Sequence, residues 1–382
     1  MYKLLFIHLS PPEIESGSVI DMRSLIKEFI LRCKYVSEVI LLTNDYKLLI
    51  DIKDVKKKYV RVIFLPLYEN PLYSLKLSTR ILIGVYSLLK HINKGIIFIG
   101  EEYPTILLPL LYLLRLFSSN VIIYKHHSYN YIKFKNEIKY SLRIFSKFYQ
   151  SIFYMFLSIL FSFSIKILKP YIIVPNQHLV NYFKSTYGLP AIYIPPGNYP
   201  PHISVDSHKS DFKSEICFVS SKIAFDFIGV LRQFYKKFLK EINIYGKPYG
   251  PQSAYLFNIL KSENYIRYHG SLRRYLLIDN LLRYCAVGIY ISYYDTWSYT
   301  LYELLLTTRF VYLVIPISEV LNAIIDVYKY MFGNSIRIHL KPSVALLSLT
   351  GFEDSQIASL QMKYVDAYCN LFKILYDSYY SR

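Results

Sequence analysis

The chain has 382 residues, of which 53% are hydrophobic and 19% charged, so a disordered protein is excluded and two domains can each bury a core. The formal net charge is +18, from 45 Lys plus Arg against 27 Asp plus Glu, which favours an anionic partner. Only Lys56, Lys57 and Lys58 form a tight basic run, and no nucleic-acid-binding module is recognisable. We therefore expect no specific nucleic-acid partner, and we interpret the run as a solvated face.

The four cysteines, Cys33, Cys217, Cys285 and Cys369, stand far apart in the sequence. They show no zinc-type spacing, and no disulfide framework is predicted for a chain of this size. Cys217 lies in an apolar run, which indicates a small core residue. The apolar run 2–7 is too short for the core of a signal peptide, so we expect a reducing, cytoplasmic location.

Short β-branched runs alternate with longer helical patterns in the first half of the chain. This alternation predicts βαβ units and a parallel sheet. The expected strands are 4–9, 39–43, 60–66, 96–99, 121–124 and 171–174; the expected helices are 18–33, 78–92, one ending near 116 and a long helical region to about 168.

The segment 149–165 carries no charged residue, and a basic stretch that begins at Lys125 precedes it. Its serines and its length disfavour a spanning helix. Two interpretations stay open: a buried helix, or an interfacial helix that brings 125–165 to an anionic membrane surface. The second interpretation favours peripheral membrane association.

A proline-rich segment, 194–201, and the polar stretch after it mark the best linker in the chain. The strand–helix alternation then resumes, which predicts a second parallel α/β domain and therefore two Rossmann-like domains. The expected domains are 1–198 (acceptor side), a linker at 199–214, 215–354 (nucleotide-sugar side) and a C-terminal helical segment at 355–382. The expected strands of the second domain are 216–219, 242–245, 266–269, 287–291 and 310–314, and the expected helices are 227–239, 254–260, 272–284 and 298–307.

The region from Asp295 to Glu303 carries the strongest chemical signal. A strand ends at Ile291, and a helix that Thr296 or Ser298 can cap begins soon after it. Free amides at such a helix start favour a diphosphate, and Glu303 lies within reach of the same ligand, where a carboxylate can accept two hydroxyl groups of a ribose. Ligands of open parallel sheets bind at the carboxyl ends of the strands, so a cleft between the two domains is the expected site.

This region is similar to the E-x7-E segment of the retaining family 4 ("group 1") glycosyltransferases, which have the GT-B fold. Asp295 and Trp297 stand where the family has Glu and Phe, and Thr296 and Ser298 replace its glycines. The resemblance implies that Asp295 contacts the donor sugar as a catalytic residue. It also implies that the backbone of Thr296, Trp297 and Ser298 holds the diphosphate, while Glu303 binds the ribose.

Other segments follow the family in the same order. The stretches 193–198, 244–248 and 267–270 resemble the family's "I-P-N-G-V-D", "I-V-G-x-G-P" and "V-x-F-L-G" motifs, which implies that Gly270 lies at the donor site. The family's Gly-Arg and Lys are missing after the first strand of the second domain. Lys222, the nearby cation, is predicted to contact phosphate; the alternative is a surface lysine.

Two residues of the first half complete the predicted site. Gly17 is what remains of the family's N-terminal Gly-Gly turn, and it still lets backbone approach a phosphate or an acceptor. His126 follows a strand where the family has a catalytic His, and it can hydrogen-bond a sugar or a leaving oxygen. The alternative is that His126 and His127 are surface loop residues.

The resemblance implies transfer of a sugar from a nucleotide-diphosphate sugar to a hydroxyl acceptor (lipid-linked, glycan or protein), with retention of configuration. The pattern requires neither a metal nor a cofactor. Three alternatives stay open: a GT-B-like binding protein with an eroded site, a nucleotide-sugar epimerase, and a nucleic-acid binder driven by charge.

Overall fold

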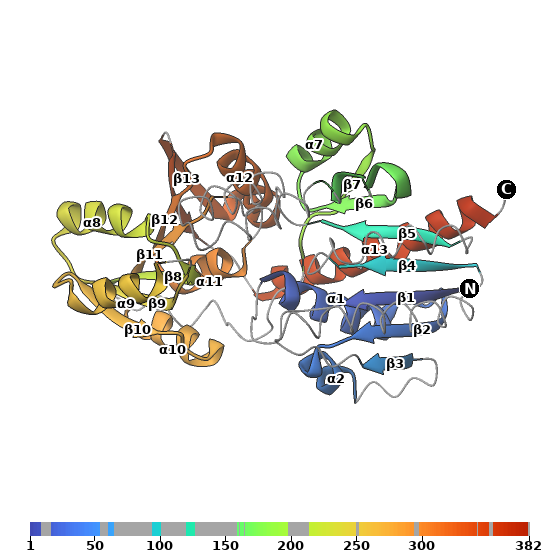
Figure 1. Ribbon diagram of the computed structural model, residues 1–382, viewed down its shortest axis with the longest axis horizontal. Helices are drawn as coiled ribbons and strands as arrows, with labels where there is room; N and C mark the ends of the chain where they lie inside the picture. Colours follow the sequence, from blue (N-terminus) through green and yellow to red (C-terminus); the bar gives the residue numbers. More distant parts are fainter. Residues whose placement is uncertain are drawn as a thin grey trace. The chain divides into compact units, whose positions relative to one another are not determined.

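The chain is described from a computed structural model, which forms two compact units (Figure 1). Unit 1 comprises Met1–Tyr131, Phe153–Tyr199 and Ser359–Arg382, and unit 2 comprises Ile132–Ile152 and Pro200–Ala358. The structure describes residues 1–8, 17–53, 60–64, 94–100, 120–126, 159, 161–163, 165–197, 214–249, 252–293, 298–341, 343–350 and 354–380.

Unit 1 is built on a seven-stranded parallel sheet in the order β3-β2-β1-β4-β5-β6-β7. The order reverses beside β1, because the chain builds outward through β2 and β3 and then resumes on the other side with β4. The strands are β1 (Tyr2–His8), β2 (Val36–Thr43), β3 (Val60–Phe64), β4 (Gly95–Ile99), β5 (Val121–Lys125), β6 (Tyr171–Val174) and β7 (Ala191–Tyr193), and the described helices include α1 (Gly17–Arg32), α2 (Tyr46–Lys53) and α7 (Gln177–Tyr187).

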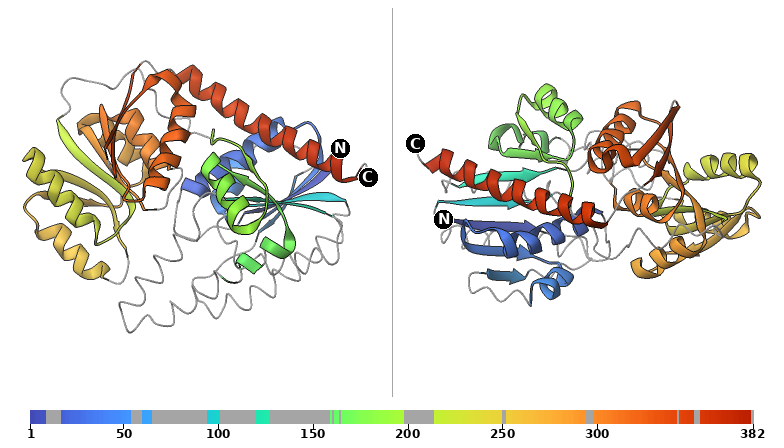
Figure 2. Two further views of the ribbon diagram at one scale, coloured as in Figure 1. Left: turned by 90° about the horizontal axis from the view of Figure 1, so that it is seen from above. Right: turned by 180° about the vertical axis from the view of Figure 1, so that it is seen from behind.

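The C-terminal helix α13 (Asp354–Tyr380) supplies part of the core of unit 1. It packs with α1 on one face of the sheet (Figure 2), where alternate strand residues such as Leu4 and Phe6 point. Phe372 of α13 lies 5.3 Å from both Phe29 and Phe98, measured between ring centroids. The sequence therefore reaches its last core residues only after unit 2 is complete.

Unit 2 has its own seven-stranded sheet in the order β10-β9-β8-β11-β12-β14-β13. The pairs among the first five strands are parallel, whereas β14 pairs antiparallel with β12 and β13. The strands are β8 (Glu215–Ile223), β9 (Ile242–Pro248), β10 (Ile266–Gly270), β11 (Cys285–Ile291), β12 (Phe310–Val314), β13 (Ile336–Lys341) and β14 (Val344–Leu349); the helices are α8 (Phe227–Phe238), α9 (Ser253–Ser262), α10 (Arg274–Tyr284), α11 (Tyr299–Thr307) and α12 (Ser318–Phe332).

One glycine of this sheet has a strict steric role. Gly246 in β9 has a φ of +145°, and a Cβ atom there would lie 1.8 Å from the carbonyl oxygen of Ser220. Only glycine fits this close approach of β9 to β8.

The predicted fold class, α/β with two Rossmann-like parallel-sheet domains, is confirmed. Every strand predicted in the described segments is present, most with shifted ends, and 171–174 and 310–314 have the predicted limits. Helix α12 and the β13–β14 hairpin were not predicted. The expected helices 78–92 and the one ending near 116 lie outside the described residues, as do most of 127–164 and of the linker 199–214.

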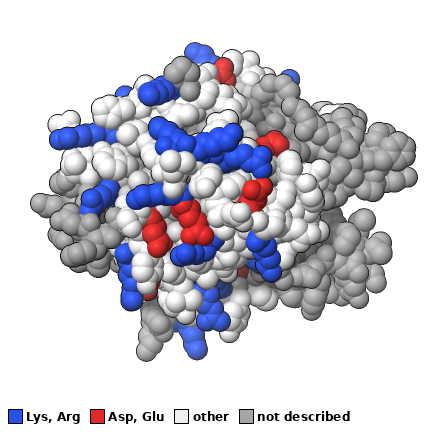
Figure 3. All heavy atoms as spheres, turned by 90° about the vertical axis from the view of Figure 1, so that its left-hand side faces the viewer, with Lys and Arg blue, Asp and Glu red and all other residues white. Residues whose placement is uncertain are grey.

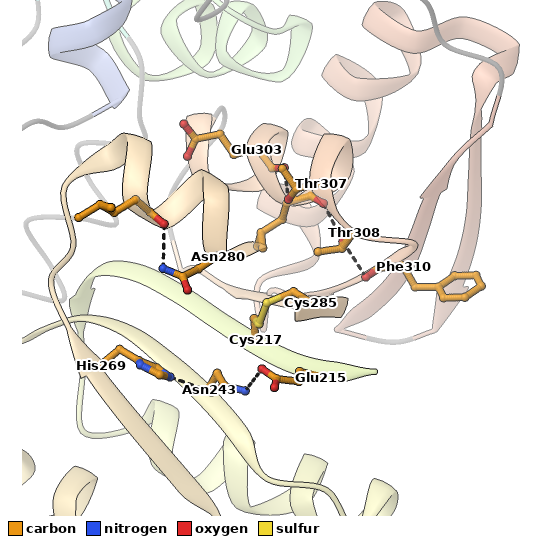
Figure 4. Close-up of a disulfide and its surroundings, with 12 residues drawn as sticks. Glu215, Cys217, Asn243, His269, Asn280, Cys285, Glu303, Thr307, Thr308 and Phe310 are labelled. Atoms are coloured by element: carbon orange, nitrogen blue, oxygen red, sulfur yellow. Dashed lines mark hydrogen bonds between the residues drawn. A yellow bond between two sulfur atoms is a disulfide. The ribbon is translucent and has the colours of Figure 1, made fainter. Parts of the chain in front are cut away.

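The prediction that no disulfide forms was wrong for Cys217 and Cys285 (Figure 4). Strands β8 and β11 are neighbours, and their register brings the two Cα atoms to 5.9 Å, a usual separation for a disulfide. The two cysteines are 68 residues apart in sequence, so spacing alone could not reveal the pair. Cys33 and Cys369 are buried free thiols in unit 1.

The Cys217–Cys285 bond gives a direct prediction for stability. Replacing both residues by alanine is expected to lower the free energy of unfolding by about 4 kcal/mol, because the bond closes a loop of this length in the unfolded chain. Urea unfolding of the oxidised protein and of the double variant measures the difference. Dithiothreitol should lower the stability of the wild type and leave that of the double variant unchanged; an unchanged wild type would contradict the bond.

Candidate functional site

The predicted helix start in unit 2 is present. Helix α11 follows the carboxyl end of β11, and Ser298 is its N-cap, with Oγ accepting a hydrogen bond from the Leu301 amide at 3.4 Å. The Tyr328 hydroxyl donates to the Ser298 carbonyl at 2.7 Å and ties this end of α11 to α12. Asp295, Thr296 and Trp297 lie outside the described residues.

Glu303 is buried on α11, with 5% of its surface exposed. Arg274, the first residue of α10, donates from Nε to Glu303 Oε1 at 2.6 Å, and its guanidinium stands 5.4 Å from the ring centroid of Tyr299. Burial raises the pKa of Glu303, and the charge and hydrogen bond of Arg274 offset only part of that rise. The contacts to Arg274 use Oε1, so Oε2 is the oxygen available to a ligand.

Arg274 is a site residue that the sequence analysis did not single out. Its contacts with Glu303 and Tyr299 place a cation beside the first turn of α11. No spacing in the sequence reveals this contact, because 29 residues separate Arg274 from Glu303 and only the packing of α10 on α11 joins them.

The remaining predicted donor residues lie on two other elements of unit 2. Lys222 is in β8, where its ammonium group stands 4.7 Å from the ring centroid of Tyr249. Gly270 ends β10 with a φ of +73°, a left-handed conformation that favours glycine. Ser298 and Glu303 share α11, whereas Lys222 and Gly270 come from strands on either side of β9.

Lysine and arginine side chains gather on the face of unit 2 that Figure 3 presents. Helices α8 and α9 contribute exposed cations, among them Lys236, Lys237 and Lys261. Arg232 of α8 is paired with Glu263 at 2.9 Å. This surface agrees with the preference for anionic ligands that the net charge indicates.

In unit 1, His126 is buried rather than exposed in a loop. Its Nδ1 lies 3.2 Å from the Tyr124 hydroxyl, and its ring packs edge-on against Phe183 of α7 at 4.9 Å. Its amide donates to the Ile173 carbonyl at 2.8 Å. The interpretation of His126 as a surface residue is therefore wrong, while His127 lies outside the described residues.

Lys125, next to His126, is enclosed on the opposite face of the sheet. It forms an ion pair with Asp21 of α1 and a hydrogen bond with the hydroxyl of Tyr364 in α13, and that hydroxyl donates to Asp21 at 3.1 Å. Gly17 is the first residue of α1, so this cluster fixes the helix that Gly17 begins. Lys125 is buried and does not contribute to a basic membrane-facing surface.

The predicted membrane-contacting segment 125–165 lies mostly outside the described residues. Within the described part of the chain, no helix combines the length and the apolar character needed to cross a membrane.

A second histidine of unit 1, His8, has an acidic partner. It is the last residue of β1 and is fully buried, and its Nε2 lies 3.2 Å from Oδ2 of Asp45. Arg23 of α1 donates from Nε to the same oxygen. The sequence analysis passed over His8; the available signal was that it is the first polar residue after an apolar strand.

Asp45 also organises the start of α2. Its Oδ1 accepts hydrogen bonds from the amides of Lys47 and Leu48 at 3.0 and 3.4 Å. Burial alone would raise the pKa of the Asp45 carboxyl, but hydrogen bonds from His8 and Arg23 and the charge of Arg23 hold it well below its ordinary value.

The lowered pKa of Asp45 predicts a loss of stability in acid. In the unfolded chain the carboxyl protonates near pH 4, whereas in the folded protein it stays ionised to lower pH. Its contribution is therefore complete above about pH 5 and falls by about 1.4 kcal/mol per pH unit below pH 4. Urea unfolding of the wild type and of Asp45→Asn between pH 3 and 7 should show a gap that narrows in acid; a constant gap would contradict the shift.

No family model matches the chain, and no curated protein matches it. Solved structures do resemble it. HepE from Anabaena, in complex with UDP and glucose, superposes with a TM-score of 0.52 at 11% identity, covering 99% of this chain and 100% of that one. The trehalose-6-phosphate phosphatase N-terminal domain of Candida albicans gives 0.54 at 12% identity, covering 100% and 97%. UGT89C1 from Arabidopsis thaliana, complexed with UDP-L-rhamnose, gives 0.50 at 10% identity, covering 97% and 99%. The chain therefore has a GT-B glycosyltransferase-like fold of two Rossmann-like α/β units.

Proposed function

We propose that the protein is a glycosyltransferase that moves a sugar from a nucleotide-diphosphate sugar to a hydroxyl acceptor. The observation that supports this most is the arrangement at α11, where the Ser298-capped helix start follows the carboxyl end of β11 and the buried Glu303 lies on the same helix. Such a helix start suits a diphosphate, and Oε2 of Glu303 suits a ribose hydroxyl. HepE and UGT89C1 were solved with UDP or a UDP-sugar, which favours a UDP-sugar as the first donor to test.

The roles of the individual residues belong to this proposal. Arg274 joins Lys222 as a cation for the diphosphate, Gly270 lets the end of β10 approach the donor, and Asp295 contacts the sugar by resemblance to the family. The family resemblance also implies retention of the anomeric configuration. A feature of unit 1, argued in the next subsection, favours inversion instead, and the configuration of the product distinguishes the two.

The proposal is tested by titrating the protein with UDP-, GDP- and ADP-glucose in a calorimeter and by following nucleotide release. Binding of one nucleotide class with release of the nucleoside diphosphate supports the enzyme. Binding without turnover on any acceptor supports a binding protein with an eroded site. No binding to any of the three contradicts the proposal.

A further inference from the structure

His8 lies where a parallel sheet offers a ligand site. It ends β1, and the strand order of the sheet reverses between β1 and β4. Ligands of open parallel sheets bind outside the carboxyl ends of the strands at such a reversal. The side chain alternates with Leu4 and Phe6, so it points to the face that α1 covers, toward Arg23 and Asp45.

The hydrogen bond to Asp45 fixes the tautomer of His8. Asp45 is ionised, because its pKa is lowered, and an ionised carboxylate only accepts hydrogen bonds. Nε2 of His8 must therefore carry the proton that points to Asp45 Oδ2, and the lone pair of the neutral ring lies on Nδ1.

Nδ1 of His8 is buried and has no hydrogen-bond partner among the described residues. An unsatisfied buried acceptor costs about 1–3 kcal/mol. Stability does not require this arrangement, since Asp45 already accepts from Arg23 and from the first amides of α2. A histidine with one nitrogen held by an acid and the other unoccupied is the arrangement of a general base.

We propose that His8, held by Asp45, is the general base that takes the proton of the acceptor hydroxyl, which rests on the glycosyltransferase function proposed above. The hydroxyl donates its proton to Nδ1 while its oxygen forms a bond to the anomeric carbon of the donor. The bond from that carbon to the diphosphate oxygen breaks, and its electron pair leaves with the nucleoside diphosphate. His8 becomes an imidazolium that Asp45 stabilises, and it returns its proton to solvent after product release.

A base that acts on the acceptor serves a single displacement, in which the acceptor attacks opposite to the leaving diphosphate. The anomeric configuration is therefore inverted, so an α-linked donor such as UDP-glucose gives a β-linked product. This outcome differs from the retention that the family resemblance implies.

The test compares acceptors that need a base with one that does not, using the full-length protein and the donor that binds in the titrations. Benzyl alcohol keeps its proton at neutral pH, whereas 4-nitrophenol is largely ionised there and needs no base. His8→Gln should lower kcat for benzyl alcohol by about 10²- to 10⁴-fold. For 4-nitrophenol it should lower kcat by less than tenfold, and donor affinity should not change.

Asp45→Asn provides a second variant with a nearly unchanged shape. The carboxamide presents an N–H to Nε2, so the ring proton moves to Nδ1 and the base is lost. The same split between the two acceptors is expected. His178→Gln in α7 is the matched control and should leave both rates unchanged; thermal unfolding confirms that each variant is folded.

The results separate this proposal from the one before it. If the donor binds and turns over but His8→Gln affects both acceptors equally, or neither, His8 is not the base. A retained configuration in the product also overturns the role. If no donor binds to the wild type, the glycosyltransferase function itself fails.

Discussion

Replacing Glu303 by alanine is expected to abolish measurable donor binding and to destabilise unit 2. Loss of the ribose contact should weaken binding by about 100-fold or more, because hydrogen bonds to a charged group contribute about 1.5–3 kcal/mol each. The substitution also leaves Arg274, bonded to Glu303 at 2.6 Å, without its acid. Breaking a buried ion pair on one side costs about 3–5 kcal/mol, and the partial exposure of Arg274 favours the lower end. Calorimetric titration and urea unfolding measure the two effects.

The double variant Glu303→Ala, Arg274→Met separates stability from binding. It removes both charges, so it should recover much of the lost free energy of unfolding, as buried pairs replaced by apolar residues often do. Donor affinity should stay low. A double variant that binds the donor as tightly as the wild type would show that Glu303 has only a structural role.

Replacing Phe372 by alanine is expected to lower the free energy of unfolding by about 3–5 kcal/mol. This side chain of α13 is fully buried, with ring contacts to Phe29 and Phe98. The substitution leaves a cavity where α13 meets the sheet of unit 1. Urea unfolding followed by circular dichroism gives the loss.

Ile374 is the matched control, because it lies on the same helix and is 60% exposed. Ile374→Ala should change the free energy of unfolding by at most about 0.5 kcal/mol. Equal losses in the two variants would mean that α13 does not belong to the core of unit 1.

Much of the fold follows from local pattern. The apolar run around Leu4 to Ile7 and the helical period of residues 18–33 read as they stand, because period and length separate a buried strand from an amphipathic helix. The β13–β14 hairpin was missed because its residues alternate weakly and follow a region where parallel strands were expected. The attachment of α13 to unit 1 was out of reach, since no local signal tells a terminal helix which core it joins.

The candidate site divides in the same way. Ser298 and Glu303 were predicted because a helix cap and the acid on its helix lie close in sequence. Arg274 and His8 were not, because each acquires its meaning from a partner 29 or 37 residues away. His126 was expected as a catalytic residue, and its aromatic surroundings are now known, while its role stays a prediction.

By itself, the sequence determined that the chain forms two α/β units and that a capped helix with a buried acid follows a strand of the second. These features depend on hydrophobic period and on residues close in the chain, where local physics decides. The tertiary structure alone decided which side chains meet: Glu303 with Arg274, His8 with Asp45, and Cys217 with Cys285. Such contacts depend on strand order and register, which bring distant residues together and leave no mark in any short stretch of sequence.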